Sequence, residues 1–406
     1  MILNGGAMSA IGGIIDLKRG SVDFSAFYSM RNALALRGRE MSTAYLDLGV
    51  AMLYCSDGFF DIDLPIISER RGYATAISYD AYFLEPKAVL ERYRAQGVEF
   101  ISELCEPFAI SLYDGERKML LLARDKKGKK PLFYIARAER VYFASEPKAL
   151  LALSSSVRVN AKALSEHLTS PIGIYSASDV YLDICEVRAG ECVLFTELGI
   201  SRFFYRESEQ KRIRSASVIG KSDKAVKGFF IINRDSLLAS LSDSLIAFDM
   251  PQFDAYIPML SQTLISAERG RLKALSLEDP IKRRHTGYSL LREDRLGAFY
   301  RVNYIGMPEK LDAREIDERR EKLRDILYLL RDELFLREDD IRNFLVDVFG
   351  ERKLSYVLSA IERGAQKNED AEQIVRILGM LLQSLEWSRL RNIELVCKEN
   401  RSYYYN

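Results

Sequence analysis

Histidine and tryptophan are nearly absent from this sequence, which has 2 His and 1 Trp among 406 residues. A metal site built from several His ligands is therefore excluded. Cysteine is also sparse: the 5 cysteines form no Cys-x-x-Cys pair, so neither a disulfide framework nor a zinc site is expected. We predict no metal site, and free thiols buried in a reducing cytoplasm.

The sequence also lacks an excess of either charge, since 59 basic residues face 58 acidic ones. This balance does not favour nucleic-acid binding. The basic run at 282–285 is of a kind that is more often a solvated loop than a phosphate or nucleic-acid site. No apolar run approaches the ~20 residues that a membrane span needs, and the start has no basic segment typical of a secretory signal. We expect a cytoplasmic protein without a membrane or nucleic-acid partner.

The length favours two domains. In residues 1–205, short apolar runs rich in β-branched and aromatic residues alternate with Gly, Asp and Pro, which predicts an α+β or layered sandwich domain. Strands are predicted at 11–16, 73–78, 108–114, 119–125, 132–136, 141–144 and 191–196. Helices are predicted at 24–36, 86–96, 146–153 and 161–168.

The remaining sequence has a different character. Residues 206–230 are charged and poor in aromatics, as in a linker. We predict that residues 231–406 form a mainly helical domain, with helices at 235–248 and almost continuously from about 312. A helix at 341–349 would end at Gly350.

Four motifs in the first half resemble the N-terminal glutaminase domain of asparagine synthetases, in the same order and at similar spacing. They are MSAIGGIID at 8–16, FAISLYD at 108–114, RDKKGKKPLFY at 124–134 and FASEPKALL at 143–151. The last two are the specific part of the resemblance. It covers about residues 8–205 and implies the four-layer αββα sandwich of N-terminal-nucleophile hydrolases.

The resemblance places the nucleophile of that family at Ser9. In the family, a cysteine directly after the initiator Met attacks glutamine, and its own α-amino group is the base. Here the cysteine position is Ser9, and further residues precede Met8. Ser9 is therefore either an inert strand residue or, if processing exposes it, a serine nucleophile for an amide.

The substrate-binding motifs of the family are altered as well. Its Arg-Gly-Pro-Asp motif is reduced to Arg37 followed by Gly-Arg-Glu, and the stretch at 50–55 lacks the family's substrate arginine. The Asn-Gly pair that binds the oxyanion becomes Ser78 and Tyr79, followed by Asp80. We expect these residues to form a degenerate substrate loop in which Tyr79 fills the space of the substrate amide.

Three charged residues of the third motif are candidates for an interface. Arg124, Asp125 and Lys130 are predicted in a turn between two strands, where they either pair with one another or contact a second domain. Glu146 and Lys148 are predicted at the first turn and surface of the next helix.

The second half departs from the synthetase domain of the family, which binds ATP through Ser-Gly-Gly-x-Asp-Ser. That motif follows Asp-Val-Pro in the family, and here Asp249-Met250-Pro251 is the counterpart. Its expected place lacks both glycines and the acidic residue. The residues there are Ile257, Pro258, Met259, Leu260, Ser261 and Gln262.

These losses predict a non-catalytic relative, a binding, scaffold or regulatory protein with a truncated synthetase-like second domain. It would need no cofactor and would bind a protein partner or a second copy of itself. The alternatives are an ATP-dependent amide-forming synthetase, which would use ATP and Mg, and a Ser-dependent amidohydrolase.

Overall fold

The computed structural model describes part of the chain, and its contacts divide the chain into two units. The first unit contains residues 1–154 and 183–221, and the second contains residues 155–182 and 222–406. The described residues are 9–35, 41–56, 64–70, 73–81, 86–104, 107–138, 140–169, 177–206, 234–235, 237–239, 241, 245, 250–251, 313–367, 371–391 and 393–396.

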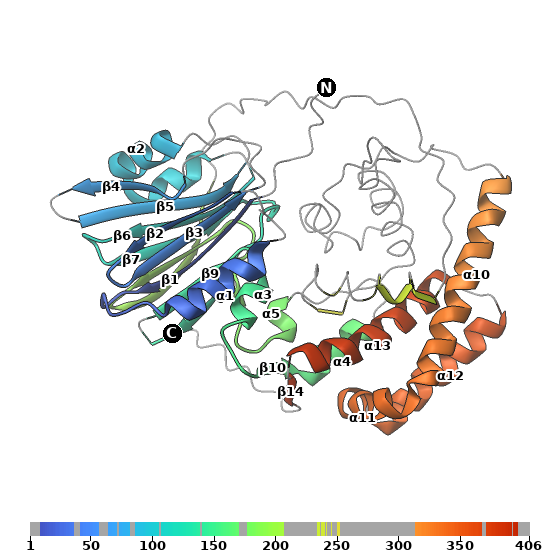
Figure 1. Ribbon diagram of the computed structural model, residues 1–406. Helices are drawn as coiled ribbons and strands as arrows, with labels where there is room; N and C mark the ends of the chain where they lie inside the picture. The colour runs from blue at the N-terminus through green and yellow to red at the C-terminus, as the bar shows by residue number, and fades with distance from the viewer. Residues whose placement is uncertain are drawn as a thin grey trace. The chain divides into compact units, whose positions relative to one another are not determined.

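Two 6-stranded antiparallel sheets form the centre of the first unit (Figure 1). The first sheet has the order β11 (Cys185–Glu186), β8 (Phe133–Arg137), β9 (Arg140–Ala144), β1 (Ser9–Asp16), β3 (Val50–Ser56) and β2 (Met41–Asp47). The second sheet has the order β13 (Gly199–Phe204), β12 (Glu191–Thr196), β7 (Met119–Arg124), β6 (Phe108–Asp114), β5 (Tyr73–Ala81) and β4 (Ile66–Arg70).

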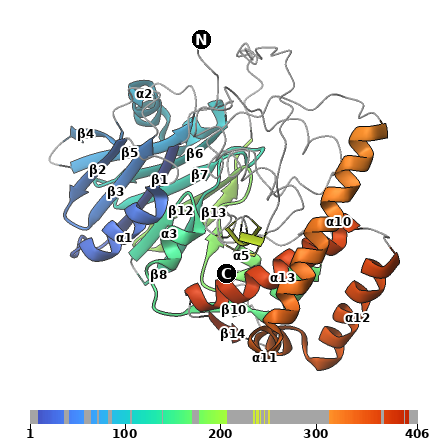
Figure 2. The same ribbon diagram turned by 45° about the vertical axis from the view of Figure 1, so that its right-hand side comes forward.

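Helices cover the outer face of each sheet, so the first unit has four layers (Figures 1 and 2). The helices α1 (Phe24–Leu34) and α3 (Pro147–Leu151) pack on the first sheet. On the second sheet lie α2 (Pro86–Gln96) and the 3-10 helix η2 (Gly97–Glu103), whose buried side chains join the central cluster. The predicted αββα sandwich is confirmed.

β1 lies at the centre of this sandwich, and all 8 of its residues are buried. It is hydrogen-bonded between β3 and β9, with Gly13 opposite Met52 and Phe143. A Cβ atom added at Gly13 would come within 2.5 Å of the Ala51 carbonyl oxygen and 2.7 Å of the Phe143 ring. The glycine therefore allows the aromatic ring to pack directly on the strand backbone.

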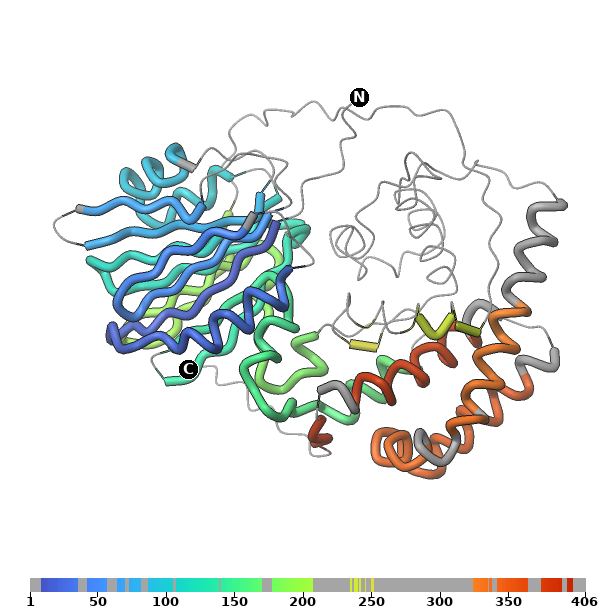
Figure 3. The backbone as a smooth tube through the Cα atoms, viewed as in Figure 1, coloured from blue at the N-terminus to red at the C-terminus, as the bar shows by residue number. Residues whose placement is uncertain are grey.

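The second unit is mainly helical. Its helices are α4 (Ala161–Thr169), α5 (Ala177–Val180), α10 (Ala313–Leu336), α11 (Glu338–Phe349), α12 (Glu351–Lys367) and α13 (Ala371–Arg391). It also contains a parallel strand pair, β10 (Val157–Asn160) with β14 (Ile393–Val396), which Figure 3 shows side by side. No helix among the described residues is long and apolar enough to cross a membrane.

The elements agree with the sequence predictions in most places and differ in a few. The predicted helix at 341–349 ends at Gly350 with φ 73°, as expected, but begins earlier, at Glu338. The C-terminal region is not wholly helical, because it includes β14. Of the predicted helix at 235–248, the described residues 235, 237–239, 241 and 245 are helical, and the linker at 207–230 lies outside the described residues.

The sequence predicts one continuous domain over residues 1–205, whereas the first unit of the structure is made of two separate segments. Residues 155–182 group with the second unit, because β10 pairs with β14 and the indole nitrogen of Trp387 donates to the Tyr181 hydroxyl at 3.1 Å. The boundary at residue 205 therefore stays a prediction.

Candidate functional site

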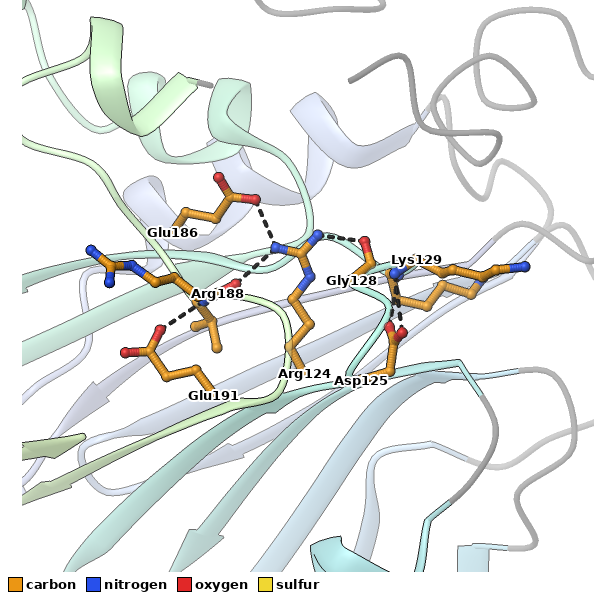
Figure 4. Close-up of polar contacts among 9 residues, drawn as sticks. Arg124, Asp125, Gly128, Lys129, Glu186, Arg188 and Glu191 are labelled. Carbon is orange, nitrogen blue, oxygen red and sulfur yellow. Dashed lines mark hydrogen bonds and ion pairs between the residues drawn. The ribbon is translucent and has the colours of Figure 1, made fainter. Parts of the chain in front are cut away.

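The loop after β7 is built around the buried guanidinium of Arg124 (Figure 4). One nitrogen of Arg124 donates to Glu186 at 2.7 Å and to the carbonyl oxygen of Val187 at 2.8 Å. A second nitrogen donates to the carbonyl oxygen of Gly128 at 2.6 Å. Arg124 therefore ties its own loop to the chain around β11 in the other sheet, an arrangement that suits a planar, forked donor.

Asp125 holds the same loop from within (Figure 4). Its carboxylate accepts the backbone N–H groups of Lys127, Lys129 and Lys130 at 3.0–3.1 Å. Gly128 lies between these donors with φ 58°, a conformation that L side chains rarely adopt. The Arg-Asp-x-x-Gly-x-Lys pattern thus gives a loop whose backbone is held by hydrogen bonds to its own Arg and Asp side chains.

That loop delivers the ammonium group of Lys130 to Asp80 of β5. The two groups are 2.8 Å apart, and their side chains are 2% and 0% exposed. The hydroxyl of Ser9, at the start of β1, donates to the same carboxylate oxygen at 2.6 Å. We call Ser9, Asp80 and Lys130 the buried triad. It links β1, β5 and the signature loop at 124–131.

The predicted loop at Ser78–Asp80 is a strand in the structure, and the degenerate substrate role of these residues stays a prediction. These residues lie in β5, which pairs with β6 from Thr75 to Ala81. Side chains alternate along a strand. Tyr79 therefore points to the face of β5 opposite the one from which Asp80 contacts Ser9. Tyr79 packs instead in the hydrophobic cluster with α2 and η2, so it does not fill the space beside Ser9.

Cys55 lies near Ser9 in the first sheet but faces the other way. It is paired in register with Ala10, while Ser9 is paired with Ser56. Its thiol lies 3.9 Å from the hydroxyl of Ser42, which in turn accepts from Arg31 of α1. Burial raises the pKa of Cys55 to about 11, so the group is a neutral thiol at pH 7. Cys55 is therefore a neutral thiol that faces away from Ser9.

The fourth motif contacts β1 along the edge that pairs with β9. The hydroxyl of Ser145 accepts from the backbone N–H of Ile11 at 2.9 Å, and the N–H of Ser145 donates to the Ile11 carbonyl at 2.8 Å. The helix predicted after Glu146 is present as α3. The surface location predicted for Glu146 and Lys148 is wrong, because both are buried and their charged groups are 2.5 Å apart.

Several sequence predictions lie outside the described residues. These are Arg37, the loop at 257–262 and the basic run at 282–285. Within the described part, no group of three or more His, Cys, Asp or Glu side chains is placed to hold a metal ion. The interface role of Arg124, Asp125 and Lys130 stays a prediction, because the contacts described above all lie within the first unit.

Comparison with known proteins finds similarity over part of this sandwich. Residues 85–206 match the glutamine amidotransferase domain. Glutamine-hydrolysing asparagine synthetase 3 of Bacillus subtilis is 25% identical over 230 residues, which are 50% of this chain and 38% of that protein. Asparagine synthetase B of Escherichia coli is 24% identical over 174 residues, 37% of this chain and 31% of that protein. The first half of the chain is therefore asparagine synthetase-like, and residues 85–206 match the glutamine amidotransferase domain.

The similarity is partial. The chain spans well under half the length of both synthetases, and the amidotransferase match begins after Asp80. Among solved structures, the glutamine phosphoribosylpyrophosphate amidotransferase of Bacillus subtilis is 13% identical, with a TM-score of 0.33 over 48% of this chain and 49% of that chain.

Proposed function

We propose that this protein is a non-catalytic relative of the glutamine-hydrolysing synthetases and acts by binding a protein partner or a second copy of itself. The observation that carries the proposal is the buried triad. It occupies the nucleophile position with three side chains that bind one another.

The chemistry of the triad opposes glutamine hydrolysis. Amide hydrolysis needs hydrogen-bond donors aimed at the developing oxyanion. The group beside Ser9 is instead the carboxylate of Asp80, which accepts from the Ser9 hydroxyl at 2.6 Å. The oxyanion would form on the substrate carbonyl that Ser9 attacks, and the Asp80 carboxylate beside Ser9 would add negative charge there instead of a donor.

The base that the family uses for its nucleophile, a free α-amino group, is also missing here. The nitrogen of Ser9 is a peptide nitrogen, since Met8 precedes it. The nearby amine, Lys130, is engaged with Asp80 at 2.8 Å. Among the contacts described, the Ser9 hydroxyl donates to the Asp80 carboxylate, which Lys130 already binds.

The test is glutaminase activity of the purified full chain, measured as glutamate release, together with its intact mass. We expect no release beyond that of the matched Ser9→Ala variant, and no adduct with an electrophilic glutamine analogue. Glutamate release that depends on Ser9 would overturn the proposal and would support the Ser-dependent amidohydrolase. The observation that favours this alternative is the closeness of Ser9, Asp80 and Lys130. Binding of Mg-ATP, seen as a thermal shift, would instead support an amide-forming synthetase.

A further inference from the structure

We infer that β2 is the surface through which two copies of this chain bind each other, by antiparallel pairing of β2 with β2 of the second copy. This inference rests on the proposed function and deepens it, because it names the partner and the surface that binds it. Three features of the first unit support it: the open edge of β2, the register that β2 adopts against itself and the hydrophobic side chains beside it.

β2 is the least protected edge strand of the two described sheets. The edge strands are β11 and β2 in the first sheet and β13 and β4 in the second. Edge strands are usually protected by shortness, charged side chains, Pro or a bulge. β11 has 2 residues, β4 contains Glu69 and Arg70, and β13 contains Arg202. β2 has 7 residues, pairs with β3 without a bulge, and has Asp47 as its one charged residue.

The backbone of β2 directs alternate residues toward the open edge. The tight turn at 48–49 makes Asp47 and Val50 a hydrogen-bonded pair of the β2–β3 hairpin. Hydrogen-bonded and non-hydrogen-bonded pairs alternate along an antiparallel ladder. Ser42, Ala44 and Leu46 therefore direct their N–H and C=O groups away from β3, and no described strand pairs with them on that side.

These outward groups are complementary to themselves. When Ala44 lies opposite Ala44 of the second copy on a twofold axis, Ser42 lies opposite Leu46 and all 7 residues of β2 are paired. Each of these pairs can exchange both N–H···O bonds, and the twofold axis closes the contact as a dimer. In this register Asp47 of each copy lies next to Ser42 of the other, whose hydroxyl accepts from Arg31. The acidic residue of each strand thus meets a basic group of the second copy.

The side chains beside this edge are hydrophobic. Four large ones are 49–61% exposed, namely Phe24, Tyr28, Leu46 and Leu48. α1 runs along β2, because its Arg31 contacts Ser42 at one end and the turn before α1 contacts the hairpin at the other, where Asp16 donates to the Gly49 carbonyl. The two aromatic residues lie one and two turns from Arg31 on the same side of α1. Exposed hydrophobic groups gathered on one face mark interaction surfaces, and a second copy on β2 would cover them.

The first experiment measures the mass of the full chain in solution by light scattering over a dilution series. We expect a dimer, and we expect Ala44→Lys to raise its dissociation constant at least about 100-fold, because two ammonium groups would meet at the axis. Ala44 is exposed, so the folded chain accepts a lysine there. Ser201→Lys puts the same side chain on the exposed edge strand β13 and should leave the dimer unchanged. A monomeric unaltered chain, or equal effects of the two variants, would overturn the inference.

The second experiment tests the register through disulfide formation. Ala44→Cys would place two thiols on the axis, because Cα atoms of a hydrogen-bonded pair lie about 5.5 Å apart, which a disulfide can span. Glutathione disulfide is the oxidant: it takes up two electrons and two protons from the two thiols and leaves as two glutathione thiols. We expect a covalent dimer on a non-reducing gel.

The matched control for the register is Leu46→Cys, on the same strand and the same face. Its two Cα atoms would lie about 14 Å apart in this register, too far for a disulfide. We expect no more covalent dimer from Leu46→Cys than from the unaltered chain. Equal yields from the two variants, or none from Ala44→Cys, would overturn the pairing.

The outcome is separable from the proposed function. Glutaminase turnover by the unaltered chain would overturn the proposed function whatever its mass in solution. A monomeric chain without turnover would overturn only the inference about β2.

Discussion

The signature loop at 124–131 and the nucleophile strand β1 belong to the same sandwich, but they relate differently to the family resemblance. The loop keeps the family's residues, and its polar groups bind its own backbone and the neighbouring chain. β1 keeps the family's backbone position but carries Ser9 where the family has cysteine. The comparison indicates that the motifs which carry the resemblance are those that build the sandwich.

The largest effect is expected at the point where the two regions meet. Lys130→Met leaves the Asp80 carboxylate buried without its counter-charge. We expect the free energy of unfolding to fall by about 3–5 kcal/mol. Urea unfolding of Lys130→Met, Asp80→Asn and the double variant checks this. The double variant should lose less than the sum of the two single variants, and additive losses would show that the pair is not coupled.

The second unit provides a contrast to the Lys130–Asp80 ion pair, because its buried His167 is held by a hydrogen bond to a backbone carbonyl. His167 is 0% exposed, and its Nε2 lies 2.9 Å from the Pro251 carbonyl oxygen. Burial, together with the nearby Arg376, lowers the pKa of His167 to about 4. The unfolded chain takes up this proton near pH 6.5 and the folded chain does not, so stability falls as the pH drops below 6.5.

The loss from His167 should reach about 3 kcal/mol by pH 4. Urea unfolding at pH 7, 6, 5 and 4, followed by the fluorescence of Trp387 in α13, measures it. His167→Gln should be less stable at pH 7 but should show a flatter dependence on pH. An equally steep dependence in that variant would assign the effect to other groups.

The signature loop can be tested without altering a side chain of the buried triad. Asp125→Ala removes the acceptor of three backbone N–H groups, two of which belong to exposed lysines that water can reach. We expect a loss of about 2 kcal/mol. Asp125→Asn, which keeps one acceptor oxygen, should recover part of it. The measurement is the urea midpoint of each variant, and unchanged midpoints would contradict the account of the loop.

The smallest effect is expected at Gly128. Its φ of 58° and the contact of an added Cβ with Arg124 at 3.1 Å oppose any side chain. Gly128→Ala should lose about 1–2 kcal/mol. Gly97 also has positive φ, at 64°, but a Cβ there would meet nothing within 4 Å, so Gly97→Ala is a matched control for the crowding term. Equal losses at both glycines would show that backbone strain alone is responsible.

The sequence predicts the sandwich well because its strands are short, apolar and separated by clear turn residues. The predicted strands at 108–114 and 191–196 coincide with β6 and β12. Five strands of the two sheets were not predicted: β2, β3, β4, β11 and β13. β2 mixes Ser, Thr and Ala with larger side chains, and β13 is an edge strand with most residues exposed, so neither has the hydrophobic pattern of a buried strand.

The triad could not be predicted as a unit, because its members come from three separate segments. Ser9 and Asp80 are 71 positions apart, and Lys130 lies in a run of lysines that otherwise face solvent. One local signal was available: an Asp inside the apolar sequence of β5 requires a buried partner. The partner itself is fixed only by the tertiary fold.

The pairing of β10 with β14 has a consequence for how the chain is made. β10 leaves the ribosome early, and its partner strand is among the last described residues. At about 5–20 residues per second, the nascent strand waits roughly 12–47 s for that partner. During this interval β11, β12 and β13 emerge and can complete the sandwich. A fragment that ends at residue 205 would therefore contain β10 without its partner strand β14. Expression of the first half alone should therefore omit residues 155–182 or cover the unpaired strand.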